Sequence, residues 1–131
     1  MAENKSNRLQ IGIIIFNCDE EADSYEEIYT KKLQPINNFG EIIRHRFKQF
    51  FKKDGRHLDI IAANYQIYCG TETIPTIGRE IDIYGEQGLY EFISLAKENN
   101  WKIFDKGLNQ FLDLEFPKNY SYSEYKNLKL R

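Results

Sequence analysis

The sequence predicts an α+β domain of the ferredoxin-like, split βαβ type, with an antiparallel-containing sheet of about five strands and the helices on one face. Apolar residues recur at strand spacing in some segments and at helical spacing in others. The elements follow the order strand, helix, strand, strand, helix, strand, strand, so a hairpin lies between two crossover helices. Right-handed crossovers place both helices on the same face, and the opposite face is then expected to be an open binding surface.

The first predicted strand covers residues 9–17. Ile11, Ile13 and Ile15 point to one side, while Ile14 and Phe16 point to the other. Because both sides are apolar, we expect this strand to lie in the middle of the sheet.

Two helical segments follow. Ser24 and Glu27 match a capping box, which predicts a helix from Tyr25 that Pro35 ends or bends. Asn38 and Glu41 give a second capping signal, and apolar residues then recur at helical spacing, which predicts a helix over 38–53.

The second half of the chain predicts a strand, a strand, a helix and a hairpin. The first strand covers 58–69, although its Ile-Ile-Ala-Ala run is also compatible with a helix, and the next covers 76–84. A helix over 89–99 ends at Asn99-Asn100, which supply a left-handed exit. The hairpin pairs 101–105 with 110–116, and we expect Asp105 and Asp113 to face solvent on its two strands.

Length and composition limit the class of protein. The 131 residues predict a single domain, 1–131, with a flexible N-terminus at 1–8 and a polar, Tyr-rich tail at 118–131. The net charge of −2 gives no general attraction to nucleic acid or acidic membranes. The longest early apolar run, 11–16, is too short for a signal peptide or a membrane span, so we expect a cytoplasmic protein.

Six carboxylates are packed into nine residues after the first strand, and they form the leading candidate for a partner-binding site. Acidic groups near a helix start are favoured by the helix dipole, and a dense cluster also attracts a basic protein. Clustered carboxylates also suit hard cations, but EF-hand spacing is missing, so we expect no metal. Glycine-rich phosphate-binding motifs are also missing, and we expect no other cofactor. The candidate partner-binding residues, including two tyrosines of the tail, are Asp19, Glu20, Glu21, Asp23, Glu26, Glu27, Tyr122 and Tyr125.

A basic segment lies about twenty residues further on. It has no accompanying nucleic-acid motif, so a solvated helix face explains it best. The alternative is a small-molecule or phosphate-binding module, with Arg44, Arg46, Lys48 and Arg79 as candidate anion-binding residues. Because the two clusters have opposite charges, a homodimer is a further possible assembly.

The third alternative is a cysteine-dependent enzyme. Nucleophilic catalysis would require Cys18 or Cys69 to lie beside His45 or His57. Nothing in the spacing favours this, and buried inert thiols are the more common outcome. We therefore predict no catalytic residues.

The segment "LYEFISLAKENNWKIFDKGLNQFLDLE" resembles small uncharacterised bacterial α+β proteins that end in an amphipathic helix, an aromatic residue and a short hairpin. The resemblance covers roughly residues 80–116. Some proteins of this kind are immunity proteins that neutralise toxins, so the resemblance implies a contact function and assigns no functional residue. Together with the acidic cluster, it leads us to expect a non-enzymatic protein that acts by protein–protein contact, in the manner of a toxin inhibitor.

Overall fold

The computed structural model describes residues 10–49, 51–54, 57–71 and 77–115. The predicted N-terminal segment 1–8 and the tail 118–131, with Tyr122 and Tyr125, lie outside the described residues.

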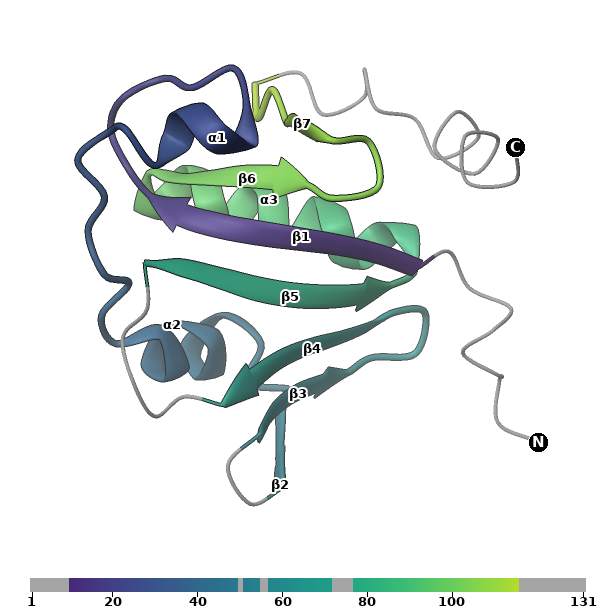
Figure 1. The fold of residues 1–131 in the computed structure, drawn as a ribbon. Coiled ribbons are helices and arrows are strands. Elements are labelled where there is room, and N and C mark those ends of the chain that lie inside the picture. Colours follow the sequence, from purple (N-terminus) through teal and green to yellow (C-terminus); the bar gives the residue numbers. More distant parts are fainter. Residues whose placement is uncertain (1–9, 50, 55–56, 72–76, 116–131) are drawn as a thin grey trace.

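The chain forms a mixed α+β structure around one antiparallel sheet (Figure 1). The seven strands lie in the order β2-β3-β4-β5-β1-β6-β7, and every neighbouring pair is antiparallel. In chain order the elements are β1 (Gln10–Asn17), α1 (Tyr25–Ile28), α2 (Phe39–Arg46), β2 (Phe51–Asp54), β3 (His57–Ile61), β4 (Gln66–Thr71), β5 (Gly78–Tyr84), α3 (Glu86–Asn99), β6 (Trp101–Asp105) and β7 (Gln110–Phe111).

The central position of the first strand is confirmed. β1 lies between β5 and β6, and its registers pair Ile13 with both Ile81 and Asp105. Ile11, Ile13 and Ile15 are fully buried on one face, and Phe16 is fully buried on the other. Burial on both faces explains why this strand has no polar side.

Seven strands replace the five that were predicted, because two segments change direction. The predicted single strand 58–69 is two strands, β3 and β4, joined by a turn in which the Ala62 backbone N–H donates to the Tyr65 carbonyl at 3.0 Å. Ile60 and Ile67 face each other across that hairpin and both point into the core. Leu58 and Ile60 are buried before the turn and Ile67 and Cys69 after it, so the buried positions change from even to odd numbers at the reversal. The run 60–63, Ile-Ile-Ala-Ala, is apolar at every position and conceals this change in the sequence.

The predicted helix over 38–53 is also wrong in its second half. α2 ends at Arg46, and residues 51–54 form β2, which pairs with β3 from Phe51↔Ile60 to Asp54↔His57. Pairing with a neighbouring strand satisfies these backbone groups and outweighs the local helical spacing of the phenylalanines.

The two longer helices cover one face of the sheet, as expected. One core cluster joins Phe39 and Ile43 of α2 and Phe92 of α3 to the strand residues on that face. Figure 1 shows α3 passing behind β6 and β1. No helix of the described residues is long and apolar enough to cross a membrane.

The expectation of an entirely open second face is corrected by α1. This helix is a single turn, much shorter than predicted, and its Ile28 packs with Ile14, Phe16 and Phe104 in a second cluster. The chain returns from α1 along β1, where Gln34 forms a bridge with Asn17. One part of the second face is therefore covered.

Candidate functional site

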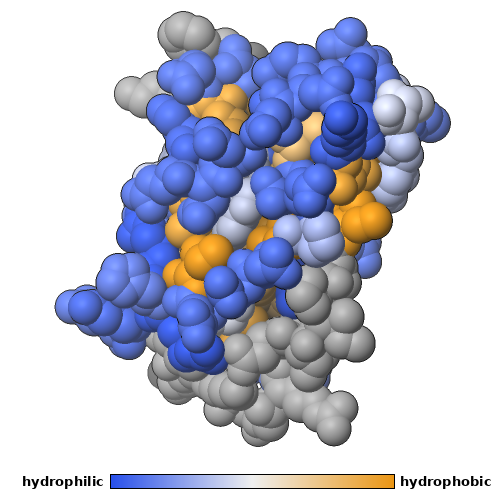
Figure 2. All heavy atoms as spheres, turned by 90° about the vertical axis from the view of Figure 1, so that its left-hand side faces the viewer, coloured by the Kyte–Doolittle hydropathy of each residue, from blue (hydrophilic) through white to orange (hydrophobic). Residues whose placement is uncertain are grey.

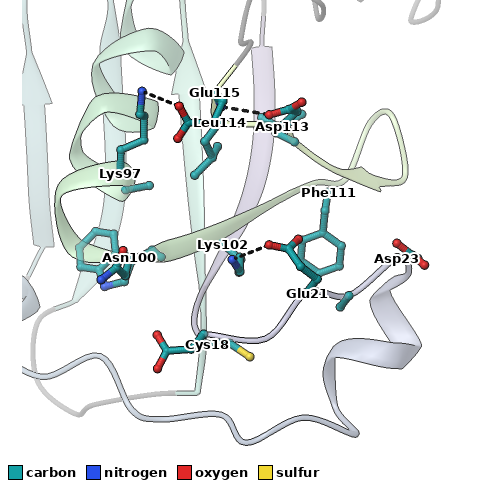
Figure 3. A pocket seen from close by; sticks show the side chains of 15 residues that line it. Cys18, Glu21, Asp23, Lys97, Asn100, Lys102, Phe111, Asp113, Leu114 and Glu115 are labelled. Atoms are coloured by element: carbon teal, nitrogen blue, oxygen red, sulfur yellow. Dashed lines mark hydrogen bonds and ion pairs between the residues drawn. The ribbon is translucent and has the colours of Figure 1, made fainter.

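A cavity lies where the loop after β1 meets the end of α3 and the segment after β7 (Figure 3). It is a half-open cleft of about 610 Å³, which we call the acidic cleft. Its floor includes apolar groups such as Trp101 and Leu112, and its rim carries most of the charged groups. The residues that line it are Cys18, Asp19, Glu21, Ala22, Asp23, Ala96, Lys97, Asn100, Trp101, Lys102, Phe111, Leu112, Asp113, Leu114 and Glu115.

The loop on one side of the acidic cleft is held at both ends. Cys18 is buried, and its Sγ donates to the Glu20 carbonyl at 3.5 Å. At the other end, Ser24 caps α1 by accepting from the Glu27 backbone N–H at 3.0 Å. The Ser24 half of the predicted capping box is thus confirmed, whereas the Glu27 carboxylate accepts from the Asp23 N–H. These two anchors restrain the backbone of the loop that carries the carboxylates.

The segment on the other side follows the last hairpin. Asp105 is buried and accepts from the backbone N–H groups of Gly107 and Leu108 at 2.8 and 3.1 Å. Leu112 then donates its N–H to the Ile103 carbonyl, which keeps the chain beside β6 up to the exposed Asp113 and Glu115. The expectation that Asp105 faces solvent is therefore wrong, because its carboxylate organises the turn; Asp113 is exposed as expected.

The acidic cleft has an excess of negative charge. Five carboxylates and two ammonium groups line it, which leaves three negative charges in excess. Lys102 Nζ lies 3.2 Å from Glu21 Oε1, and Lys97 Nζ lies 3.8 Å from Glu115 Oε2 (Figure 3). The Glu21 side chain is 91% exposed, so this ion pair contributes little to stability and leaves the carboxylate available to a partner.

The predicted acidic cluster is divided by the structure. Asp19, Glu21 and Asp23 line the acidic cleft. Glu20 instead accepts from the Lys32 backbone N–H at 3.1 Å, beside a separate smaller cavity. Glu27 accepts from the Asp23 N–H and pairs with Lys31, and Glu26 is exposed on α1.

Sequence reasoning missed the half of the site that comes from the end of α3 and the segments after it: Lys97, Lys102, Asp113 and Glu115. A usable signal was present, because the predicted topology pairs the last long strand with the first. Trp101 is paired with Asn17, directly before the acidic loop. The two acidic segments are therefore neighbours in space although they lie about ninety residues apart in the chain.

The four candidate anion-binding residues are not gathered at one place. Arg46 lines a groove of about 710 Å³ between α2 and α3, and its guanidinium pairs with Glu91 at 2.9 Å. Arg79 is buried on the sheet, with its guanidinium carbon 4.2 Å from the centre of the Phe39 ring. Arg44 is partly buried on α2, and Lys48 is exposed just beyond it.

The two cysteines are both buried free thiols. Burial raises the pKa of the Cys69 thiol above its ordinary value of 9.0; Arg79 opposes this shift and Asp59 adds to it. A thiol held protonated near neutral pH is a poor nucleophile. Among the described residues, no group of three or more His, Cys, Asp or Glu side chains is placed to hold a metal ion.

Comparison with known proteins gives no relative. No family model matches the chain, and neither a curated protein nor a solved structure matches it.

Proposed function

We propose that this chain is a non-enzymatic protein that acts by contact, and that its acidic cleft receives a basic segment of a partner protein. The observation that carries the proposal is the convergence of carboxylates from two remote segments, 19–23 and 113–115, on one half-open cleft. The backbone of each segment is anchored by hydrogen bonds: Ser24 caps α1 after the first, and in the second Leu112 N–H donates to Ile103 and Glu115 N–H to Asp113.

The chemistry of the acidic cleft supports recognition of a cationic protein. Its carboxylates offer acceptors to lysine and arginine side chains, and such pairs are charge-assisted. Its apolar floor at Trp101 and Leu112 offers contact to the aliphatic stems of the same side chains. If the partner is a toxin with a basic active site, occupation of the cleft would cover that site, as an immunity-type inhibitor does.

We infer further that the scaffold is an elaborated ferredoxin-like fold. The support is the order of the inner strands, β4-β5-β1-β6, in which α3 connects the two strands on either side of β1. In this interpretation α1, the β2–β3 hairpin and β7 are additions to a split βαβ core. An experimental structure in which β1 pairs with β4 in place of β5 would contradict it.

The proposed function is tested with two triple variants used as paired baits in a lysate of the cells that encode the protein. The cleft variant is Glu21→Gln, Asp23→Asn, Glu115→Gln. The control variant, Glu41→Gln, Glu86→Gln, Glu98→Gln, removes the same charge from exposed positions on α2 and α3. A partner should be retained by the wild-type protein and the control variant and lost from the cleft variant.

The retained protein is then purified and its Kd measured. We expect the cleft variant to bind at least about tenfold more weakly than the control variant, which is about 1.4 kcal/mol. For a toxin partner, inhibition of its activity should follow the same order. Equal affinity of the two variants would overturn the proposal.

A further inference from the structure

The second face of the sheet carries a surface separate from the acidic cleft. It is formed by the side chains of β3, β4 and β5 that point away from α2 and α3. Neighbouring positions across the strands run Asp59–Tyr68–Asp82 in one row and Gln66–Tyr84 in the next. We call this surface, together with Glu80, the tyrosine face.

Two aromatic rings form the centre of the tyrosine face. Tyr68 and Tyr84 meet edge to face, with ring centroids 5.7 Å apart and planes at 84°. The Tyr68 hydroxyl donates to Gln66 Oε1 at 3.3 Å, which restrains the side chain. Both residues are half-buried, so part of each ring is accessible.

The three helices of the described residues pack on parts of the sheet other than the tyrosine face. α2 and α3 pack on the opposite face, and α1 packs over Ile14, Phe16 and Phe104. No helix of the described residues packs over Tyr68 and Tyr84 in either core cluster. The space-filling view from the α1 and α2 side is mostly hydrophilic, with apolar areas interrupted by polar groups (Figure 2).

The charge of the tyrosine face is negative. Asp59, Glu80 and Asp82 carry carboxylates, and Lys106 supplies one ammonium group that lies 3.1 Å from Glu80 Oε1. Asp82 is exposed and stands between Tyr68 and Gly12 in its row. Gly12 has no side chain, and the Lys106 side chain, including its ammonium, lies over it beside the Asp82 carboxylate.

We propose that the tyrosine face binds the arginine side chains of a basic partner segment and discriminates against lysine. A guanidinium group is flat, so it can stack on a tyrosine ring while its N–H groups reach a neighbouring carboxylate. Tyr68 lies between Asp59 and Asp82 across the strands, which is the combination that this chemistry needs. A lysine ammonium is a compact, strongly hydrated charge and gains less from the ring.

This inference goes beyond the proposed function, because recognition in the acidic cleft was argued from its carboxylates, which accept either cation. Residues at α1 connect the two surfaces: the centroid of the Phe16 ring lies 6.1 Å from that of the Phe111 ring, which lines the acidic cleft. Tyr29 of α1 contacts Phe16 with ring centroids 5.8 Å apart, and the Glu80 carboxylate is close enough to contribute to the raised pKa of Tyr29. A basic segment that leaves the acidic cleft could therefore continue to the tyrosine face across α1.

The test uses two labelled peptides of equal length, oligo-arginine and oligo-lysine, titrated by calorimetry into the wild-type chain. We expect the arginine peptide to bind about fivefold more tightly, as a stacking contribution of about 1 kcal/mol implies. Tyr68→Leu should remove this preference while affinity for the lysine peptide is retained. Asp82→Asn should weaken both peptides and reduce the preference, and it serves as the second probe if Tyr68→Leu does not fold.

The cleft variant separates this proposal from the proposed function. It should bind both peptides more weakly but keep the arginine preference, since Tyr68 and Asp82 are intact. Equal affinity of the wild-type protein for the two peptides would overturn the inference, as would an unchanged preference in Tyr68→Leu. Either result leaves capture of a partner by the acidic cleft as a separate question with its own outcome.

Discussion

Gly85 is the residue at which the backbone most clearly demands glycine. Its φ is +100°, and an added Cβ would lie 2.7 Å from the Asn64 carbonyl oxygen. Gly70 also has a positive φ, +74°, but a Cβ there meets nothing within 4 Å. Gly70→Ala should cost about 1–2 kcal/mol for the left-handed backbone alone, and Gly85→Ala about 2–5 kcal/mol because overpacking is added. Urea denaturation of the two variants measures the difference, and equal costs would show that the Asn64 contact yields without penalty.

The buried thiol of Cys69 should make the free energy of unfolding fall as the pH rises into the alkaline range. Burial raises the pKa of this thiol in the folded chain, while the unfolded chain titrates near the ordinary value of 9.0. Below pH 9 both states hold the proton, so the full contribution is present. Above it the unfolded state releases the proton first, and the free energy of unfolding should fall by up to about 1.4 kcal/mol per pH unit.

This loss is measured by urea denaturation at a series of pH values from neutral into the alkaline range. Burial also raises the pKa of Tyr65 and Tyr90, so a shallower loss should persist in Cys69→Ala at the highest pH values. The variant will be less stable throughout, and the informative quantity is its slope just above pH 9. A slope identical to that of the wild-type protein would contradict the assignment to Cys69.

At the scale of elements, α1 is a single turn whose existence depends on its cap. Ser24 Oγ accepts from the Glu27 N–H, and the helix is too short to form without tertiary support. Ser24→Ala should destabilise the protein by about 1 kcal/mol, and Ser24→Asp, which restores an acceptor, should recover most of this. Thermal unfolding of both variants distinguishes a cap from a packing role, since a packing role would make the larger aspartate the worse substitution.

The sequence predicted best the elements in which the local pattern of apolar residues agrees with the position of the element in the fold. β1 is apolar on both faces and central, and α3 has an apolar face and ends at Asn100 in the left-handed conformation, with φ of 58°. The segments 38–53 and 58–69 were misread because their reversals depend on partners distant in the chain. Phe51 of β2 pairs with Ile60 of β3, and the sequence around either residue does not predict that pairing.

At the scale of the whole molecule, half of the acidic cleft was predictable and half was not. Asp19, Glu21 and Asp23 stand out as a run in the sequence, whereas Asp113 and Glu115 are two acidic residues in an ordinary hairpin. Only the antiparallel pairing of β6 with β1 brings the second pair to the first. The tyrosine face was hidden for the same reason, because Tyr68, Tyr84 and Asp82 lie on two different strands and meet only through register.

Association with a basic partner should depend on salt, because the charges of the acidic cleft lie at its rim. From about 50 mM to about 500 mM salt the screening length shortens to a few ångströms, and exposed charges no longer steer an approaching molecule. The association rate of the oligo-lysine peptide should fall at least about tenfold over this range, and its dissociation rate should change much less. Stopped-flow fluorescence measures both rates.

Lys102 supplies the matched variant for this experiment. It is one of the two cations in the acidic cleft, and its ammonium lies 3.2 Å from Glu21. Lys102→Gln should raise the association rate at low salt, since the excess of negative charge grows from three to four, and should converge with the wild-type protein at high salt. The control variant on α2 and α3 loses charge outside the lining of the cleft and should alter the rate less than the cleft variant does. If that variant slows association as much as the cleft variant does, the peptide senses only the total charge of the molecule, and the acidic cleft is not its docking site.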